Sequence, residues 1–371
     1  MNGCLNDTER MLHLIIKESN GEFDAKKILG NLMMDITAKC FFGIDINAQF
    51  SENSDFIKYA KRVLSFTFQD YRFIFISKLL LSVQYLYRGA VFSAMFPNLA
   101  RIIENISGYE FFDGECNEFF KNIIEKAIET KRAEPSENMT CWQVYWIALT
   151  KKWQISMKCS TKEELEGLII SQLFVFIIAA FDPTSSTLLY CLYNLAMHPA
   201  IQLQAYKEIV NIIGGKEVIE YDDLSSMNYL NQVINETLRM YPQAPRLLRE
   251  CNKDIEIGGI YFEKGSALLV PIFAIHYNND YYPDPEKFDP ERFSPENIVH
   301  RDPLAWLPFG FGPRICIGQR LATTTTRLIL ARLLRDFHFI PCDKTPRLPL
   351  RINTAGFTTP VNPIILSVER R

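Results

Sequence analysis

A lone cysteine lies in a glycine-rich stretch, FGFGPRICIGQRLA, that runs from Phe309 to Ala322. An amphipathic pattern follows it and continues to about Phe339, which predicts a helix that begins close to Cys316. A helix N-terminus offers free N–H groups and a favourable dipole, and Arg314 adds a nearby cation. These features favour a thiolate at Cys316, the form in which cysteine binds metals.

The glycines around this cysteine indicate what the thiolate faces. Gly310 and Gly312 allow a tight loop that can aim backbone amides at the sulfur. Gly318 leaves a bare patch against which a planar ligand can rest. The whole loop therefore favours a metal-bound thiolate under a large flat ligand over an inert buried thiol.

A second polar group occurs in NETLRMYP, where Glu236 and Arg239 are three residues apart and share one helix face. Most such pairs are exposed and contribute little to stability. The apolar neighbours leave the burial of this pair undecided, so the exposed pair remains the simpler interpretation. Arg292, in the later segment PERF, is a candidate to join and hold it.

The most legible predicted helix runs from about 161 to 198. Ser160 and Glu163 form a capping-box pattern before it, and the apolar run from Gly167 to Phe181 is too short to span a bilayer. Asp182 and Pro183 begin a polar stretch, DPTSST, and the proline predicts a kink. Buried polar groups beside a kink indicate either a working cavity or a cluster of serines and threonines that satisfy one another.

Other segments predict the remaining elements. Helical spacing is found over 24–43 and 116–135, and short β-like runs over 254–262 and 266–273. The stretch 71–103 is aromatic and aliphatic, and we interpret it as buried core, with a surface that dips into lipid as the alternative. A proline-rich coil over 278–297 needs something to hold it in place.

The composition of the chain excludes some classes of function. The chain has 371 residues, of which 48% are hydrophobic, and 40 basic residues against 43 acidic ones give a formal charge of -3. This balance provides no overall basic field for nucleic acid. The nine cysteines are scattered, which is typical of thiols in a reducing compartment and not of a disulfide framework.

Together these motifs resemble the cytochrome P450 family of haem-thiolate monooxygenases. The haem loop of that family, F-x-x-G-x-R-x-C-x-G, is matched at every fixed position by Phe309, Gly312, Arg314, Cys316 and Gly318. Glu236 and Arg239 match its E-x-x-R helix, and Arg292 matches the arginine of its P-E-R-F segment. The wording of the motifs is closest to microsomal enzymes of animals, especially the insect group that metabolises xenobiotics.

The resemblance implies a mainly α fold with small β-sheets. It implies a single catalytic domain over 1–371, with a helical substrate-access region over 1–160 and a haem-binding region over 161–371. The chain begins partway along the family's domain, so we expect the membrane anchor and the first sheet of the family to have no counterpart in it.

The resemblance also assigns roles to residues. Haem b is the implied cofactor, with Cys316 as its metal ligand. The implied cofactor-binding residues are Phe309, Gly310, Arg314, Cys316, Gly318 and Arg249. Glu236, Arg239 and Arg292 are implied to form a structural network behind the haem. Ala179 and Ala180 are implied to lie near bound oxygen, and Phe176, Leu247 and Phe357 near a lipophilic substrate.

One departure from the family concerns proton delivery. The family's central helix has an acid followed by a threonine, whereas here Asp182 is followed by Pro183, which cannot relay a proton. Thr184 is the nearest hydroxyl, but one further residue along a helix turns its side chain by about 100°. Asp182 and Thr184 are therefore the candidate catalytic polar residues, with altered oxygen activation expected.

The expected function is insertion of one oxygen atom from O₂ into a small lipophilic compound. The implied partners are NADPH-cytochrome P450 reductase and cytochrome b5, at the cytosolic face of the endoplasmic reticulum membrane. Two alternatives remain open: a haem-binding protein with impaired catalysis, for which Pro183 and the shortened start argue, and a reductase-independent haem-thiolate isomerase.

Overall fold

The computed structural model describes residues 1–51, 55–64, 114–133, 162–354 and 356–371. These residues form two compact units. Unit 1 comprises residues 1–37, 47–50 and 179–371, and unit 2 comprises the described parts of 38–46 and 51–178. The two units are described separately below, and the predicted division of the chain near residue 160 stays a prediction.

Helices dominate the described residues, so the prediction of a mainly α fold is confirmed. None of the helices in these ranges is long and apolar enough to cross a membrane. The α-helices are α1 (Asn2–Glu18), α2 (Ala25–Thr37), α3 (Asp55–Leu64), α7 (Gly114–Ala133), α9 (Lys162–Met197), α10 (Pro199–Ile213), α11 (Tyr221–Ser226), α12 (Asn228–Met240), α13 (Ile272–His276), α14 (Pro295–Ile298) and α15 (Gln319–Asp336). A π-helix, η1 (Ala38–Phe42), and three 3-10 turns, η2 (Pro290–Phe293), η3 (Pro303–Ala305) and η4 (Gly312–Arg314), complete the set.

The strands of unit 1 form small antiparallel sheets. The three-stranded sheet has the order β1-β9-β6, and the two-stranded sheets are β2-β5, β3-β4 and β7-β8. Their bounds are β1 (Glu22–Asp24), β2 (Leu247–Glu250), β3 (Ile255–Ile257), β4 (Ile260–Phe262), β5 (Ala267–Val270), β6 (Phe337–Pro341), β7 (Ile352–Asn353), β8 (Thr359–Pro360) and β9 (Ile365–Arg370).

The core of unit 1 is built by three helices, α10, α12 and α15, which pack against one another. Each buries apolar residues three or four positions apart, the spacing that places side chains on one helix face. Fully or almost fully buried examples are Ala205, Ile209 and Ile213 on α10, Leu230, Val233 and Ile234 on α12, and Ile329, Leu330 and Leu333 on α15.

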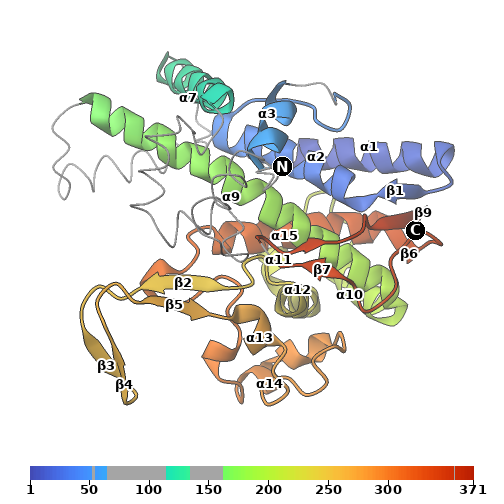
Figure 1. The fold of residues 1–371 in the computed structure, drawn as a ribbon. Helices are drawn as coiled ribbons and strands as arrows, with labels where there is room; N and C mark the ends of the chain where they lie inside the picture. The colour runs from blue at the N-terminus through green and yellow to red at the C-terminus, as the bar shows by residue number, and fades with distance from the viewer. Residues whose placement is uncertain (52–54, 65–113, 134–161, 355) are drawn as a thin grey trace. The chain divides into compact units, whose positions relative to one another are not determined.

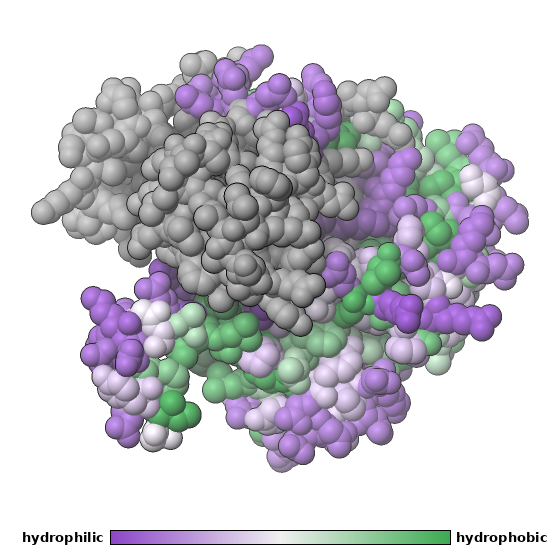
Figure 2. Space-filling view, in the orientation of Figure 1, coloured by the Kyte–Doolittle hydropathy of each residue, from purple (hydrophilic) through white to green (hydrophobic). Residues whose placement is uncertain are grey.

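A small hairpin extends from the β2-β5 sheet, as Figure 1 shows. Strands β3 and β4 are joined by Gly258 and Gly259, whose φ angles of +59° and +80° suit a two-residue hairpin turn. Figure 2 shows apolar residues gathered over the β2-β5 sheet and a largely hydrophilic hairpin. Ile257, Ile260 and Tyr261 are the exposed apolar side chains of the hairpin.

Aromatic contacts hold the described parts of unit 2 together. Phe56 of α3 meets Phe120 of α7 edge to face, with ring centroids 5.4 Å apart. Arg62 also donates to Glu115 at 2.8 Å.

Most predicted elements are confirmed, with changed boundaries. The segment 24–43 forms α2 followed by η1, and the strand-like runs form β3, β4 and β5. The helix after Cys316 ends at Asp336, and the predicted amphipathic stretch continues as strand β6. The proline-rich coil contains the short elements η2 and α14. The stretch 71–103 and Ser160 lie outside the described residues.

A glutamine side chain covers the open edge of strand β6. Gln202 of α10 is fully buried; its Nε2 donates to the carbonyl of Phe339 at 2.8 Å, and its Oε1 accepts from the amide of Phe339 at 3.0 Å. Because β6 lies at the edge of its sheet, these two backbone groups have no strand beyond them. Gln202 therefore completes the backbone hydrogen bonding of the sheet.

We predict that Gln202→Leu lowers the free energy of unfolding by about 2–4 kcal/mol, because it leaves two buried backbone groups of Phe339 without partners. Urea unfolding followed by circular dichroism measures this change. Gln204→Leu on the same helix is the matched control, since Gln204 is exposed. Equal stability of the two variants would show that the edge of β6 does not depend on Gln202.

Candidate functional site

The cysteine loop, which we define as Phe309–Gly318, is folded by its own backbone. The amide of Cys316 donates to the carbonyl of Phe309 at 2.9 Å, which closes the loop. Gly310 and Gly312 have φ angles of +74° and +77°, a conformation that glycine adopts without strain. Helix α15 begins directly after Gly318, so the sulfur lies just before a helix N-terminus.

The loop presents an exposed thiol among exposed apolar side chains. Cys316 is the only exposed cysteine among those that the structure describes. Phe311, Ile315 and Ile317 are 59%, 48% and 76% exposed. A Cβ on Gly318 would lie 3.8 Å from the sulfur of Cys316, so the missing side chain leaves the space beside the thiol open. The amides of Ile317 and Gly318 donate to no acceptor in the described residues.

Strand β2 lies against this loop. A Cβ on Gly310 would be 3.7 Å from the side chain of Leu247, so these two predicted site residues are neighbours. Arg249 is two residues further along β2 and donates to the carbonyl of Leu248 at 2.8 Å. Arg314 is exposed in the loop. The structure gives no contact between Arg249 and Arg314.

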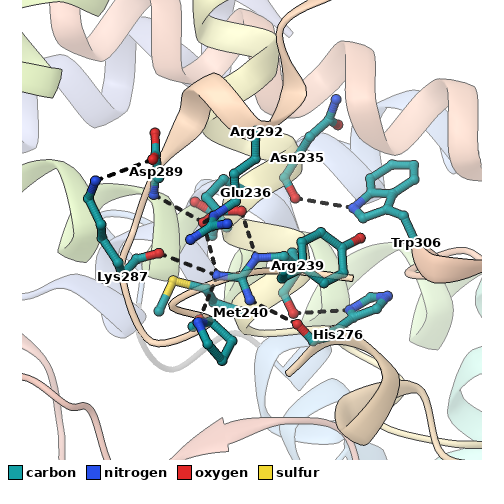
Figure 3. A network of polar contacts seen from close by, with 12 residues as sticks. Asn235, Glu236, Arg239, Met240, His276, Lys287, Asp289, Arg292 and Trp306 are labelled. Atoms are coloured by element: carbon teal, nitrogen blue, oxygen red, sulfur yellow. Dashed lines mark hydrogen bonds and ion pairs between the residues drawn. The ribbon is translucent and has the colours of Figure 1, made fainter. Parts of the chain in front are cut away.

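The predicted polar pair on α12 is fully buried, contrary to the simpler interpretation of an exposed pair (Figure 3). Arg239 donates to both carboxylate oxygens of Glu236, at 2.7 Å and 2.9 Å, in a bidentate arrangement. Its remaining donors reach backbone carbonyls of His276 at 2.9 Å and Pro285 at 2.8 Å. Every nitrogen of this buried guanidinium therefore has a hydrogen-bond acceptor.

Glu236 also contacts two residues of the segment 289–292. The amide of Asp289 donates to Glu236 Oε1 at 3.0 Å, and Nε of Arg292 lies 3.4 Å from the same oxygen as an ion pair. Burial raises the pKa of the Glu236 carboxyl, and the bonds from Arg239 and Asp289 and the charge of Arg292 oppose that rise. The structure therefore brings Glu236, Arg239 and Arg292 together.

Two network residues were missed from the sequence. His276 ends α13 and contacts both Arg239 and the amide of Leu307, and Trp306 donates from Nε1 to the carbonyl of Asn235 at 3.3 Å. A histidine at the end of a short helix and a tryptophan in a coil carry no spacing signal. The only sequence signal for Trp306 is that it lies three residues before the cysteine loop.

The polar stretch of α9 is held by a lysine from another helix. Lys26 of α2 donates to Asp182 Oδ1 at 2.6 Å, to Ser185 at 3.1 Å and to Ser186 at 2.6 Å. Ser185 in turn donates to the carbonyl of Asp182 at 3.0 Å. Of the two alternatives raised by the sequence, these contacts favour a satisfied cluster for this face of α9.

The other predicted site residues are distributed as follows. In unit 1, Ala179 is exposed, Ala180 is half-buried and Thr184 is buried, and α9 continues through Pro183 without interruption. Phe357 is 44% exposed, and the carbonyl of the next residue, Thr358, accepts from Tyr190 of α9 at 3.1 Å. In unit 2, Phe176 stacks on Phe41 of η1 with centroids 5.9 Å apart.

We predict that Glu236→Gln lowers the free energy of unfolding by about 3–5 kcal/mol, because it leaves the buried charge of Arg239 uncompensated. Urea unfolding measures the loss. Glu291→Gln in the neighbouring η2 is the control, since Glu291 is exposed and should change stability by no more than about 0.5 kcal/mol. A Glu236→Gln variant as stable as this control would contradict the network.

Comparison with known proteins gives a consistent result. A sequence model described as "Cytochrome P450" matches residues 3–368. The chain is 34% identical over 355 residues to cytochrome P450 3A12 of Canis lupus familiaris, covering 95% of this chain and 66% of that protein. It is 36% identical over 346 residues to cytochrome P450 3A16 of Mus musculus, covering 93% of this chain and 64% of that protein.

The chain thus spans slightly less than two thirds of the length of these relatives. The family match nevertheless covers almost the whole chain, including the cysteine loop and the α12 network. This chain belongs to the cytochrome P450 family.

Proposed function

We propose that this chain is a haem-thiolate monooxygenase that inserts one oxygen atom from O₂ into a small lipophilic substrate. Membership of the cytochrome P450 family implies a haem-iron cofactor. The observation that carries the proposal is the exposed thiol of Cys316 at the centre of a closed, glycine-containing loop. We propose haem b as the form of the cofactor.

The residues present fit such a group. A haem is a flat, largely apolar disc, and Phe311, Ile315 and Ile317 expose apolar side chains beside the thiol. A soft sulfur ligand suits iron in this family of sites. Gly318 has no side chain to cover the sulfur, and a residue with a Cβ at that position would place it 3.8 Å from the sulfur.

Different residues of the cysteine loop and of β2 would hold different parts of the cofactor. Cys316 would ligate the iron as a thiolate, with the unengaged amides of Ile317 and Gly318 available to stabilise its charge. Arg314 and Arg249 would pair with the haem propionates. The backbone of Phe309 and Gly310 would keep the loop closed under the disc. When bound, the haem supplies oxygen activation with two electrons taken up one at a time.

Proton handling is assigned to α9. Ala179 and Ala180 would leave room for oxygen and substrate, since both have only a methyl side chain. Asp182 keeps its carboxylate next to the ammonium of Lys26, and Thr184 is the nearest hydroxyl to Pro183 along the chain. We propose Leu247 and Phe357 as substrate contacts, since both are apolar and incompletely buried. The assignment of Phe176 to substrate contact stays a prediction.

The proposed partners follow from the family alone. We propose that electrons come from NADPH-cytochrome P450 reductase, with cytochrome b5 as a second donor. We propose that the protein works at the cytosolic face of the endoplasmic reticulum membrane, on xenobiotic compounds. Association of the full chain with that reductase in vitro is a direct test of the partner.

We predict that the full chain takes up haem and that the reduced, carbon monoxide-bound form has the strongly red-shifted band of a thiolate complex. Cys316→Ser should abolish this band, because an alcohol is not ionised at neutral pH and cannot replace the thiolate. Cys342→Ser is the control: Cys342 is less buried than the core cysteines, and a serine hydroxyl can donate towards the carbonyl of Ile365 and accept from Thr345, as the thiol does. A red-shifted band in Cys316→Ser would exclude Cys316 as the ligand.

A second candidate function is rearrangement of a lipid hydroperoxide without a reductase. It is favoured by Pro183, which removes the relay hydroxyl, and by the engagement of Asp182 with Lys26. Consumption of NADPH in the presence of reductase supports the monooxygenase. Turnover of a lipid hydroperoxide in the absence of reductase and NADPH supports the isomerase. Haem uptake with neither activity would leave a haem-binding protein with impaired catalysis.

We predict that Pro183→Thr lowers the hydrogen peroxide released per NADPH consumed, because it restores a hydroxyl that can pass protons. Pro183→Ala is the matched control, since it removes the proline from α9 without adding a hydroxyl. Peroxide yield is measured at fixed reductase concentration. If both variants lower the peroxide yield equally, the change is caused by removal of proline from the helix backbone, and the proton-relay explanation is wrong.

A further inference from the structure

His276 is a buried histidine whose two ring nitrogens are both engaged. Its side chain ends α13 and is fully buried. Nδ1 lies 3.0 Å from the carbonyl oxygen of Arg239, and Nε2 lies 2.9 Å from the backbone nitrogen of Leu307. The ring therefore joins α12 to the segment that leads into the cysteine loop.

These partners assign the tautomer of His276. A backbone amide can only donate, so Nε2 must be the unprotonated nitrogen that accepts from Leu307. Nδ1 then carries the hydrogen and donates to the carbonyl of Arg239. Only the neutral ring makes both bonds, because a protonated ring has no acceptor to offer Leu307.

The bond between His276 and Arg239 is reciprocal. The guanidinium of Arg239 donates from Nη1 to the carbonyl of His276 at 2.9 Å, while the ring of His276 donates to the carbonyl of Arg239. Figure 3 shows this exchange beside the Glu236 carboxylate. The guanidinium of Arg239 thus holds the backbone of His276, and the backbone of Arg239 holds its ring.

Leu307 passes this constraint to the cysteine loop. Its carbonyl accepts from the amide of Gly310 at 3.0 Å, and the loop then closes from Phe309 to Cys316. The two residues before Leu307 are also held. The hydroxyl of Tyr282 donates to the carbonyl of Ala305, and the indole of Trp306 donates to the carbonyl of Asn235. His276 is bonded to the residue that begins the hydrogen-bond path to the thiol.

The two cations near His276 favour its neutral form. Arg239 on α12 and Arg301 after α14 are cations, and the ring of Tyr282 lies 6.5 Å away, centroid to centroid. Burial, with help from these two cations, lowers the pKa of His276 to about 4, and its bond to the carbonyl of Arg239 opposes the shift. Because the pKa is below the usual 6.5, the neutral ring is favoured, and its stabilising effect is lost as the pH falls from 6.5 towards 4.

We propose that His276 is a positioning residue that sets the cysteine loop, and hence the thiolate of Cys316, by holding the amide of Leu307 on its unprotonated Nε2. This inference rests on the proposed haem ligation for its functional meaning. The anchoring itself does not need the cofactor.

Hydrogen exchange of the full chain without haem tests the anchoring. His276→Gln places a side-chain oxygen where Nε2 lies and retains an acceptor for Leu307, whereas His276→Asn is too short to reach it. We expect the amides of residues 304–307, 309 and 310 to exchange about 5-fold faster or more in His276→Asn than in the unchanged chain, with His276→Gln in between or unchanged. His338→Gln, at a half-exposed histidine on β6, is the matched control and should have no effect. Equal protection in His276→Asn and the unchanged chain would overturn the proposal.

The pH profile of the red-shifted carbon monoxide band tests the positioning role. We expect the unchanged chain to lose the band between about pH 6 and pH 4, and His276→Gln to keep it to lower pH, because glutamine does not titrate there. Identical pH profiles would show that His276 does not position the thiolate. Absence of the band at neutral pH in the unchanged chain would instead contradict the proposed ligation, and the exchange experiment would still decide the anchoring.

Discussion

The burial of one guanidinium is the constraint on which the packing between α12 and the segments before the cysteine loop depends. Arg239 is fully buried, and a buried charge is tolerated only when it is paired and its donors have acceptors. Glu236 on the same helix supplies two acceptors, and the others are backbone carbonyls of His276 and Pro285. The proline-rich segment after α13 therefore takes its path from the acceptors that Arg239 requires, although it contains little regular structure.

The same helix reaches the cysteine loop by separate routes. The carbonyl of Asn235 accepts from Trp306, and the carbonyl of Arg239 accepts from the ring of His276, which in turn accepts from the amide of Leu307. Helix α12 is fixed in the core by its opposite, apolar face. The glycines of the cysteine loop adopt positive φ angles, and hydrogen bonds tie the segment before this loop to α12, most of whose residues are buried.

The sequence predicts what depends on local spacing. The glycines of the cysteine loop, the shared face of Glu236 and Arg239, and the β-like run over 254–262 follow from patterns within a few residues, although the turn that folds this run into the β3-β4 hairpin was not predicted. Burial of the Glu236 pair could not be predicted, because apolar neighbours do not tell whether another segment covers the pair. The contacts of His276 and Lys26 could not be predicted either: Lys26 and Asp182 are 156 residues apart, and helical spacing indicates a face but not the partner that meets it.

The polar stretch of α9 around Pro183 shows how such a distant partner changes the chemistry available. Asp182, Ser185 and Ser186 lie three or four residues apart on one face, and all three accept from Lys26. Since each residue turns the helix by about 100°, Thr184 points about 200° away from Asp182. In the family's usual order the acid and the threonine are adjacent and only about 100° apart. With Pro183 between them, a direct hydrogen bond from Thr184 to Asp182 is excluded by helix geometry, and any proton path that uses both residues must pass through a third group.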